Sequence, residues 1–136
     1  SKELAAMEHL SKENQYLHKR EAFLCNQLIK QTELFNKLKT TKYIDNKLWQ
    51  EIKEKIDLLF DNYTKRLCNQ IPSLTDGDIQ ICCLIKLRFS NGDIANMLAI
   101  SPTSVSKRKL RLKERIVQEI GSLGENQSLD LWLMEY

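Results

Sequence analysis

Glycine, proline, histidine and aromatic residues are all scarce in this chain. Its 136 residues include four Gly, two Pro and two His, and aromatic residues make up 7% of the total. Runs of β-branched residues are also absent. Because Gly and Pro mark turns and β-branched residues favour strands, these absences disfavour a protein built from many short strands. With 42% apolar and 29% charged residues, the composition is that of a folded protein, and the sequence predicts an all-α fold.

The cysteines and histidines lack the spacing of a metal site. No two cysteines form a C-x-x-C pair, and the histidines are His9 and His18. Because a zinc site needs clustered ligands, no metal is expected. Cys82 and Cys83 lie in the apolar run IQICCLIKL, which predicts buried free thiols and suits a reducing cytosol.

Signals for catalysis and for membrane insertion are missing too. The sequence has no Gly-rich phosphate loop and no His after residue 18, so neither an enzyme nor a cofactor is expected. There is no signal peptide, and the longest apolar run is interrupted by Gln80 and Lys86, so no membrane contact is expected for this piece. The chain starts inside a helical pattern without an initiator Met, which suggests a fragment of a longer protein.

Residues 1–42 have the pattern of a coiled-coil dimerisation helix. Apolar side chains recur at heptad positions a and d, and Asn14 occupies an a position, where one polar residue typically specifies a two-stranded coil. Glu21 and Gln31 weaken this seam, and a lone amphipathic helix packed on its own domain is the alternative. The predicted dimerisation residues are Met7, Leu10, Asn14, Leu17, Leu24, Leu28, Phe35 and Leu38.

Residues 43–72 predict a second long amphipathic helix, a connector that packs on the C-terminal domain. Asp45 is a candidate N-cap, Ile44 and Trp49 have the spacing of a hydrophobic staple, and Pro72 is expected to end the helix. We interpret Trp49 and the apolar stripe as core and not as a ligand pocket. The stripe comprises Leu48, Ile52, Ile56, Leu59, Phe60, Tyr63 and Leu67.

Residues 73–121 repeat one helix-start signal three times. Thr75, Ser90 and Ser101 are candidate N-caps, each preceded by an apolar residue that can form a staple. The spacing predicts helices over about 76–87, 91–98 and 102–120, and the last two have the helix-turn-helix pattern. The expected core residues are Ile79, Cys83, Leu84, Leu87, Ile94, Leu98, Ile100, Val105, Leu112 and Ile116.

Residues 122–136 predict a short final helix, over about 127–135, with Asn126 as its N-cap. Its residues Leu129, Trp132 and Leu133 are expected to cover part of the core. A partner-binding tail is the alternative.

Helix 102–120 carries a dense cluster of cations. The net charge of +3 is mild, so the distribution of charge matters more than its sum. An ordinary solvated helix face would intersperse Glu with Lys, whereas Glu114 is the one acid near this cluster and the cations are expected to be unpaired. The cluster comprises Lys107, Arg108, Lys109, Arg111, Lys113 and Arg115.

A basic helix that follows such a turn can enter the DNA major groove, where its outward side chains reach base edges. Val105, Leu112 and Ile116 are expected to face inward. The predicted base-contacting residues are then Thr103, Ser106, Lys107 and Leu110. The predicted phosphate-contacting residues are Ser90, Asn91, Arg108, Lys109, Arg111 and Lys113.

Residues 74–116 resemble the LuxR/GerE-type DNA-binding domain, as found at the C-terminus of Bacteroidetes regulators with tetratricopeptide or other sensor repeats. The resemblance implies a four-helix domain with a helix-turn-helix, sequence-specific DNA binding, and dimers on paired half-sites. It is carried, without gaps, by Leu74-Thr75, Asp78, Ser90-Asn91, Asp93-Ile94-Ala95, Leu98, Ile100-Ser101 and Ser104-Val105.

Two kinds of departure from that family stand out. The family usually has Gly at the position of Arg88 and often at that of Ala99, and a left-handed Ala99 would cost roughly 1 kcal/mol. The family's Lys-Val-His run is replaced by the segment 106–108, Ser-Lys-Arg, so base preference does not carry over.

Together these patterns predict a cytoplasmic, sequence-specific DNA-binding transcriptional regulator, the C-terminal part of a longer sensor-regulator. It would insert helix 102–120 into the major groove as a coiled-coil-paired homodimer, with RNA polymerase as a further candidate partner. Alternatively, the chain would be the cytoplasmic portion of a regulator that is anchored in a membrane. The alternative functions are a promoter-recognition module like sigma-factor region 4, and a coiled-coil interaction module that does not bind DNA.

Overall fold

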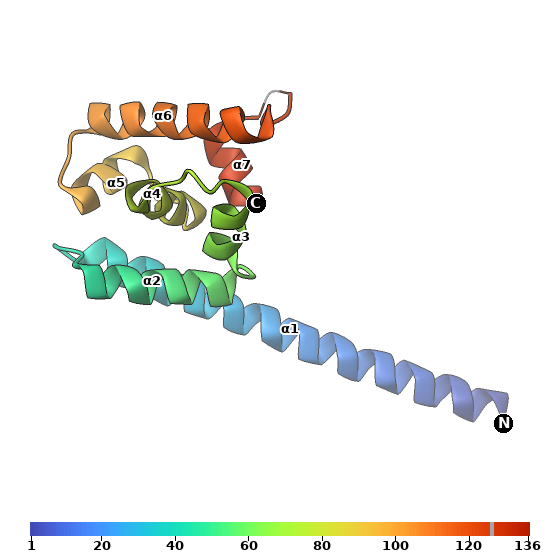
Figure 1. Ribbon diagram of the computed structural model, residues 1–136. Helices are drawn as coiled ribbons and strands as arrows, with labels where there is room; N and C mark the ends of the chain where they lie inside the picture. Colours follow the sequence, from blue (N-terminus) through green and yellow to red (C-terminus); the bar gives the residue numbers. More distant parts are fainter. Residues whose placement is uncertain (126) are drawn as a thin grey trace. The chain divides into compact units, whose positions relative to one another are not determined.

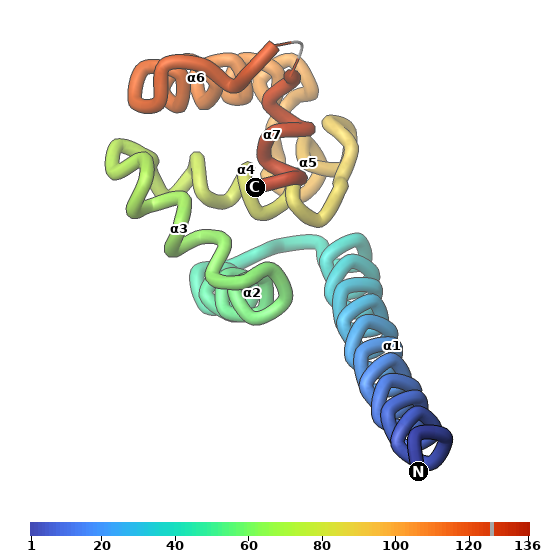
Figure 2. Tube along the Cα trace, turned by 90° about the vertical axis from the view of Figure 1, so that its right-hand side faces the viewer, coloured from blue at the N-terminus to red at the C-terminus, as the bar shows by residue number. Residues whose placement is uncertain are grey.

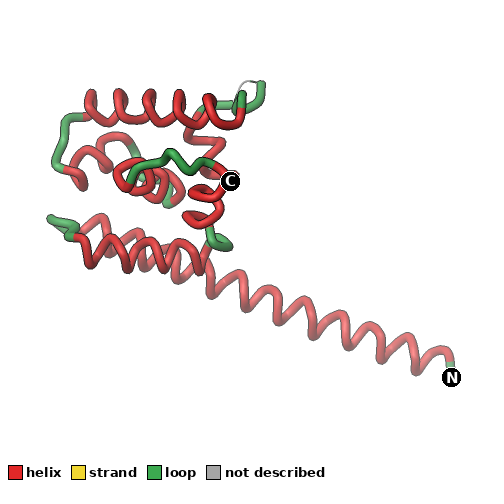
Figure 3. The backbone as a smooth tube through the Cα atoms, viewed as in Figure 1, coloured by secondary structure: helices red, strands yellow, loops and turns green. Residues whose placement is uncertain are grey.

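The computed structural model describes residues 1–125 and 127–136, and within them the chain forms seven α-helices and no strand (Figures 1 and 3). The predicted all-α class is therefore confirmed. The chain divides into two compact units, Ser1–Glu33 and Leu34–Tyr136. The helices are α1 (Lys2–Thr40), α2 (Asn46–Leu59), α3 (Tyr63–Gln70), α4 (Asp76–Lys86), α5 (Asn91–Leu98), α6 (Pro102–Ile120) and α7 (Leu129–Glu135).

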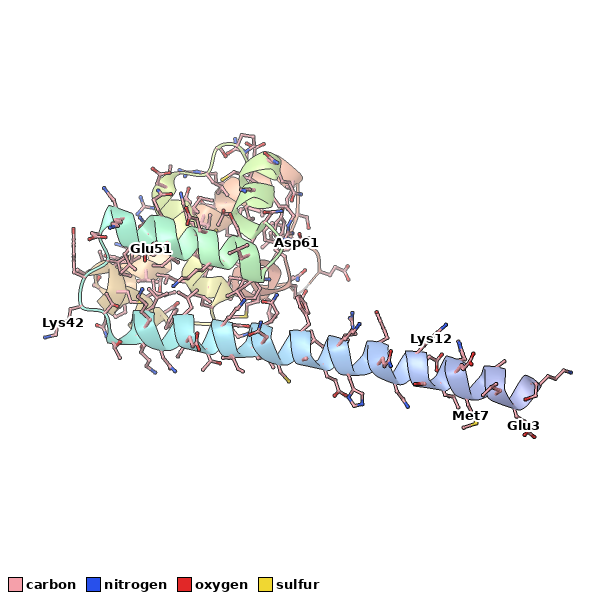
Figure 4. All side chains as sticks on the ribbon, turned by 90° about the horizontal axis from the view of Figure 1, so that it is seen from below. Glu3, Met7, Lys12, Lys42, Glu51 and Asp61 are labelled. Carbon is pink, nitrogen blue, oxygen red and sulfur yellow. The ribbon has the colours of Figure 1, made fainter. Side chains whose placement is uncertain are left out.

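The first unit consists of the amino-terminal part of α1. Its apolar side chains are exposed, with Met7 at 67% and Leu10 at 57% of their full accessible area. Figure 4 shows Met7 and Lys12 projecting from different sides of the helix. This helix therefore presents an apolar surface that has no partner within its own unit. Covering such a surface would lower the free energy, because large apolar side chains are more stable out of water.

The last two turns of α1 belong to the second unit, not to a separate dimerisation segment that ends at residue 42. Leu34 and Leu38 are 4% and 0% exposed. Phe35 stacks on Phe89, with ring centroids 4.3 Å apart. Phe35 and Leu38 therefore pack within one chain, and their assignment to the dimer seam is corrected. The heptad pattern did not separate the two roles, because a dimer seam and a packed helix face both repeat apolar residues every three or four positions.

The predicted connector helix is two helices, α2 and α3, with a sharp break between them (Figure 2). Asp61 and Asn62 both take positive φ, at 51° and 54°, a conformation that Asn and Asp tolerate better than most residues. The Asp57 carboxylate stabilises the break by accepting bonds from the amide and the hydroxyl of Thr64, at 2.7 and 2.6 Å. The apolar spacing continues across the break, so periodicity alone did not reveal it.

The start of α2 follows the prediction. Asp45 is the N-cap, and its carboxylate accepts a 2.7 Å bond from the Leu48 amide. Trp49, Ile52 and Ile56 are buried, which places Trp49 in the core as expected.

Helix α4 is the central element of the second unit and contacts α2, α6 and α7. Thr75 and Asp78 form a reciprocal capping box at its start, with both bonds present. Nearly all of the predicted core is buried, whereas Leu98 and Ile100 are only partly buried at its edge. The buried residues of α4 are Ile79, Ile81, Cys82, Cys83, Leu84 and Ile85.

Helices α5 and α6 begin and end where the sequence predicts them. Ser90 and Ser101 accept bonds from Asp93 and Ser104 amides, both at 3.1 Å. Pro102 occupies the first turn of α6, where its missing N–H costs nothing. Local capping chemistry is therefore sufficient to set these boundaries.

The final helix, α7, starts at Leu129 with Ser128 as its N-cap. The predicted cap, Asn126, lies outside the described residues. Leu129 and Leu133 are buried and Trp132 packs against the core, so the helix covers part of the core as expected. Arg66 of α3 fastens its end, donating a 2.8 Å bond to the Tyr136 carbonyl.

Thiol reactivity gives a direct test of this packing. Cys25 and Cys68 are exposed, whereas Cys82 and Cys83 are buried, and burial raises the pKa of both buried thiols. Because the thiolate is the reactive form, a chromogenic disulfide reagent at pH 8 should react with two thiols in the folded protein and four after unfolding. The variant with Cys25→Ser and Cys68→Ser should show no fast-reacting thiol. Fast reaction in that variant would contradict the packing of α4.

The two positions at which the resembled family has Gly both adopt left-handed backbone. Arg88 has φ 67° and Ala99 has φ 54°. Ala99→Gly should therefore raise the free energy of unfolding by about 1 kcal/mol, because Gly avoids the steric cost of this conformation. Urea titration measures the change. The matched control, Ala95→Gly within α5, should lower it by about 1 kcal/mol, and a destabilised Ala99→Gly variant would rule out the left-handed turn.

Candidate nucleic-acid interface

Helix α6 separates an apolar face from a polar one. Val105, Leu112 and Ile116 are each 0% exposed, as predicted. The predicted base-contacting residues Thr103, Ser106, Lys107 and Leu110 are all exposed on the opposite side. The Ser106 hydroxyl donates a 3.3 Å bond to the Pro102 carbonyl within the helix. The structure thus brings these four residues together on one accessible face near the amino end of the helix.

A short turn joins α5 to α6 and fixes their relative placement (Figure 1). Left-handed Ala99 ends α5, and its amide bonds back to the carbonyl of Asn96 at 3.3 Å. The next amide, of Ile100, bonds to the Ala95 carbonyl at 3.0 Å. This arrangement satisfies the end of α5 and directs the chain at once into α6.

Ser90 and Asn91 lie at the amino end of α5, and both are exposed. The Ser90 hydroxyl accepts the bond from the Asp93 amide as the helix cap. The first amides of α5 have no intrahelical acceptor. What this end offers to an anion is therefore backbone N–H groups together with the Asn91 side chain.

One predicted phosphate contact, Lys109, is already paired within the chain. Its ammonium group lies 3.0 Å from an oxygen of Asp130 in α7, and its side chain is only 12% exposed. The expectation that the cations of α6 are unpaired is wrong at this position. Sequence reasoning missed the pair because its partners are 21 residues apart and belong to different helices.

A second cation, Arg115, forms an ion pair with Asp78 of α4. The Asp78 side chain is 15% exposed, so this pair links α6 to α4 in a partly buried setting. Here too the expectation of unpaired cations is corrected. Among the described residues, Lys107, Arg108, Arg111 and Lys113 have no carboxylate within ion-pair distance.

Three arginines of α6 converge on a cavity beside the amino end of α4. The cavity has a volume of about 240 Å³. Its lining includes Arg108, Arg111 and Arg115 from α6, Gly77 from α4, and Thr75, the N-cap of α4. We call this cavity the arginine pocket; Asp78 and Ile81 complete its lining. The spacing of the arginines places them on one helix face, but the sequence did not indicate that α4 would close the other side.

Most of the predicted dimerisation residues lie in the first unit and are exposed. This unit holds Met7, Leu10, Asn14, Leu17, Leu24 and Leu28 on one helix. Leu17, Leu24 and Leu28 are 54%, 49% and 63% exposed. These side chains are available to a partner, unlike Phe35 and Leu38.

Asp130 provides a test of how the Lys109 pair affects binding. If α6 binds duplex DNA, Asp130→Asn should raise the affinity about two- to fivefold, because it removes one negative charge beside α6 and releases the partly buried Lys109 ammonium for a phosphate contact. Fluorescence anisotropy at low salt measures the change. Glu119→Gln removes an exposed acid from α6 without releasing a lysine and is the matched control. Equal gains in the two variants would show that total charge alone is responsible.

Within residues 1–125 and 127–136, no three His, Cys, Asp or Glu side chains are close enough together to hold a metal ion. None of the described helices combines the length and apolar character needed to cross a bilayer.

Comparisons with protein-family models, with curated proteins and with solved structures found no match to this chain.

Proposed function

We propose that this chain is a sequence-specific DNA-binding transcriptional regulator that acts in the cytoplasm. Helix α6 inserts into the major groove, and Thr103, Ser106, Lys107 and Leu110 meet base edges. Arg108, Arg111 and Lys113 bind phosphates on either flank, together with the amino end of α5.

The observation that carries this proposal is the exposed, cation-rich face of α6. Val105, Leu112 and Ile116 are fully buried, while Lys107 and Leu110 are exposed, with Leu110 at 58%. A major groove admits one α-helix, and Arg or Lys together with an apolar contact to thymine is a common means of reading base edges. The ion pair with Asp130 removes Lys109 from the phosphate-binding set, and the remaining cations are sufficient for a salt-dependent contact.

We also propose that the first unit pairs two copies of the chain. Its exposed residues at a and d positions suit a second identical helix, and Asn14 suits a two-stranded coil. Two copies would place two α6 helices on paired half-sites.

The resemblance of residues 74–116 to the LuxR/GerE-type domain supports the same function. The left-handed Arg88 and Ala99, at the family's glycine positions, add to that likeness. By the same resemblance, the chain would be the C-terminal part of a longer sensor-regulator. RNA polymerase is a further candidate partner.

The test of this function is the salt dependence of binding to duplex DNA. We expect log K to fall linearly with log salt, with a slope of about −5 to −6, because three cations in each of two copies would meet six phosphates at roughly 0.9 each. Anisotropy of a labelled duplex at several salt concentrations measures the slope. Absence of binding, or binding that does not respond to salt, would instead favour an interaction module that does not bind DNA.

A further inference from the structure

The arginine pocket has a charge and a shape that base contacts do not explain. We call the side of α6 that carries the proposed base-contacting residues the reading face, and the pocket lies beside it. It lies between α4 and α6 and is lined from both helices. Three guanidinium groups and one carboxylate line it, which leaves two positive charges in excess. Arg115 and Asp78 neutralise each other as an ion pair, so the excess belongs to Arg108 and Arg111.

The amino end of α4 adds hydrogen-bond donors to the pocket. The Asp78 amide is already taken by the Thr75 hydroxyl at 3.1 Å. The amides of Asp76 and Gly77 precede it in the first turn, where backbone N–H groups have no intrahelical acceptor, and Gly77 lines the pocket. Because Asp76 and Asp78 carry negative charge in the same turn, the helix end alone would not attract an anion. The arginines supply the attraction.

Planar guanidinium groups that surround a small space match the geometry of a phosphate group, which they bind through paired N–H donors. Asp78 holds Arg115 in place through the ion pair. The Asp78 carboxylate also accepts a 3.0 Å hydrogen bond from the Thr75 amide. The Arg115 side of the pocket is therefore positioned before any ligand arrives. This preorganisation reduces the entropy lost on binding.

We propose that the arginine pocket holds one backbone phosphate of the bound DNA duplex. This inference rests on the proposed binding of α6 to the major groove. In that geometry the sugar-phosphate backbones run along the flanks of the helix, and Arg108 and Arg111 lie on one flank of the reading face. The contact would fix the register of α6 in the groove from the α4 side.

A free phosphate or a nucleotide would offer the same chemical group. The DNA backbone is a better match than a nucleotide, because the cavity of about 240 Å³ is smaller than the roughly 300–1,000 Å³ of typical small-molecule sites. Its lining also continues onto the exposed face of α6.

Single methylphosphonate substitutions in a bound duplex test the proposal. Each removes the charge of one phosphate, and at one position in each half-site we expect wild-type affinity to fall about tenfold. In the variant with Arg108→Gln and Arg111→Gln, neutralising that same phosphate should cost less than twofold, because the partner charges are already gone. Lys113→Gln, on the other flank, should keep the full tenfold sensitivity there.

Each outcome bears on one claim. If the double variant and the wild type are equally sensitive at every position, the pocket does not hold a DNA phosphate. If the wild type binds no duplex, the proposed function fails and this inference fails with it. If inorganic phosphate or ATP binds the wild type in the micromolar range but not the double variant, and no methylphosphonate weakens DNA binding, the pocket belongs to a free anion and the proposal is overturned.

Discussion

Replacing Leu10 and Leu17 by Lys should convert the protein to a monomer and lower its affinity for paired DNA half-sites by about 10²–10⁴-fold. Each apolar side chain buried in a coiled-coil seam contributes about 1.5–3 kcal/mol, and an unpaired charge at that site adds a desolvation cost. Once the copies separate, the second half-site no longer gains from the effective concentration that linkage provides, which accounts for the size of the loss.

Light scattering measures the mass of this variant, and anisotropy measures its affinity. Both substituted residues lie in the first unit and are exposed, so the second unit should melt at an unchanged temperature. Gln15→Lys with Asn26→Lys adds the same charge away from the seam and should remain dimeric. A wild-type protein that is already monomeric at micromolar concentration would contradict the pairing.

The second large effect separates base reading from phosphate binding. Lys107→Ala should reduce discrimination at one base pair of each half-site by about 1–3 kcal/mol, or roughly 5- to 150-fold, because its proposed contact is to a base edge. Lys113→Ala should instead weaken binding to all sequences about equally and reduce the magnitude of the salt slope by about 1.8, because each copy of the dimer loses one phosphate contact worth roughly 0.9. Both side chains are exposed, so neither change should unfold the protein.

Competition between the best duplex and single-base variants of it measures both effects. The two variants act as controls for each other, since each removes one lysine from the same helix. If Lys107→Ala weakens every duplex equally, the assigned orientation of α6 is wrong.

Local chemistry made the C-terminal helices predictable from the sequence. Thr75, Ser90 and Ser101 each cap a helix through a bond to a residue three positions on, so the signal and its effect lie close together in the chain. The inward face of α6 followed in the same way from the spacing of Val105 and Leu112.

Features that depend on residues far apart in the sequence could not be predicted from local signals. Lys109 meets Asp130, and Arg115 meets Asp78, across 21 and 37 residues, and no local pattern records such pairs. The arginine pocket forms only where α4 and α6 pack against each other. The break at Asp61 and Asn62 interrupts a stripe whose spacing continues, and tertiary packing and the Asp57 bonds decided it.

Selection of binding sites from random duplexes at two salt concentrations tests the central claim most directly. We expect a two-fold symmetric consensus, with enrichment that is stronger at low salt, and loss of the symmetry in the Leu10→Lys, Leu17→Lys variant. No enrichment at either salt concentration, or a consensus unchanged by Lys107→Ala, would contradict DNA reading by α6.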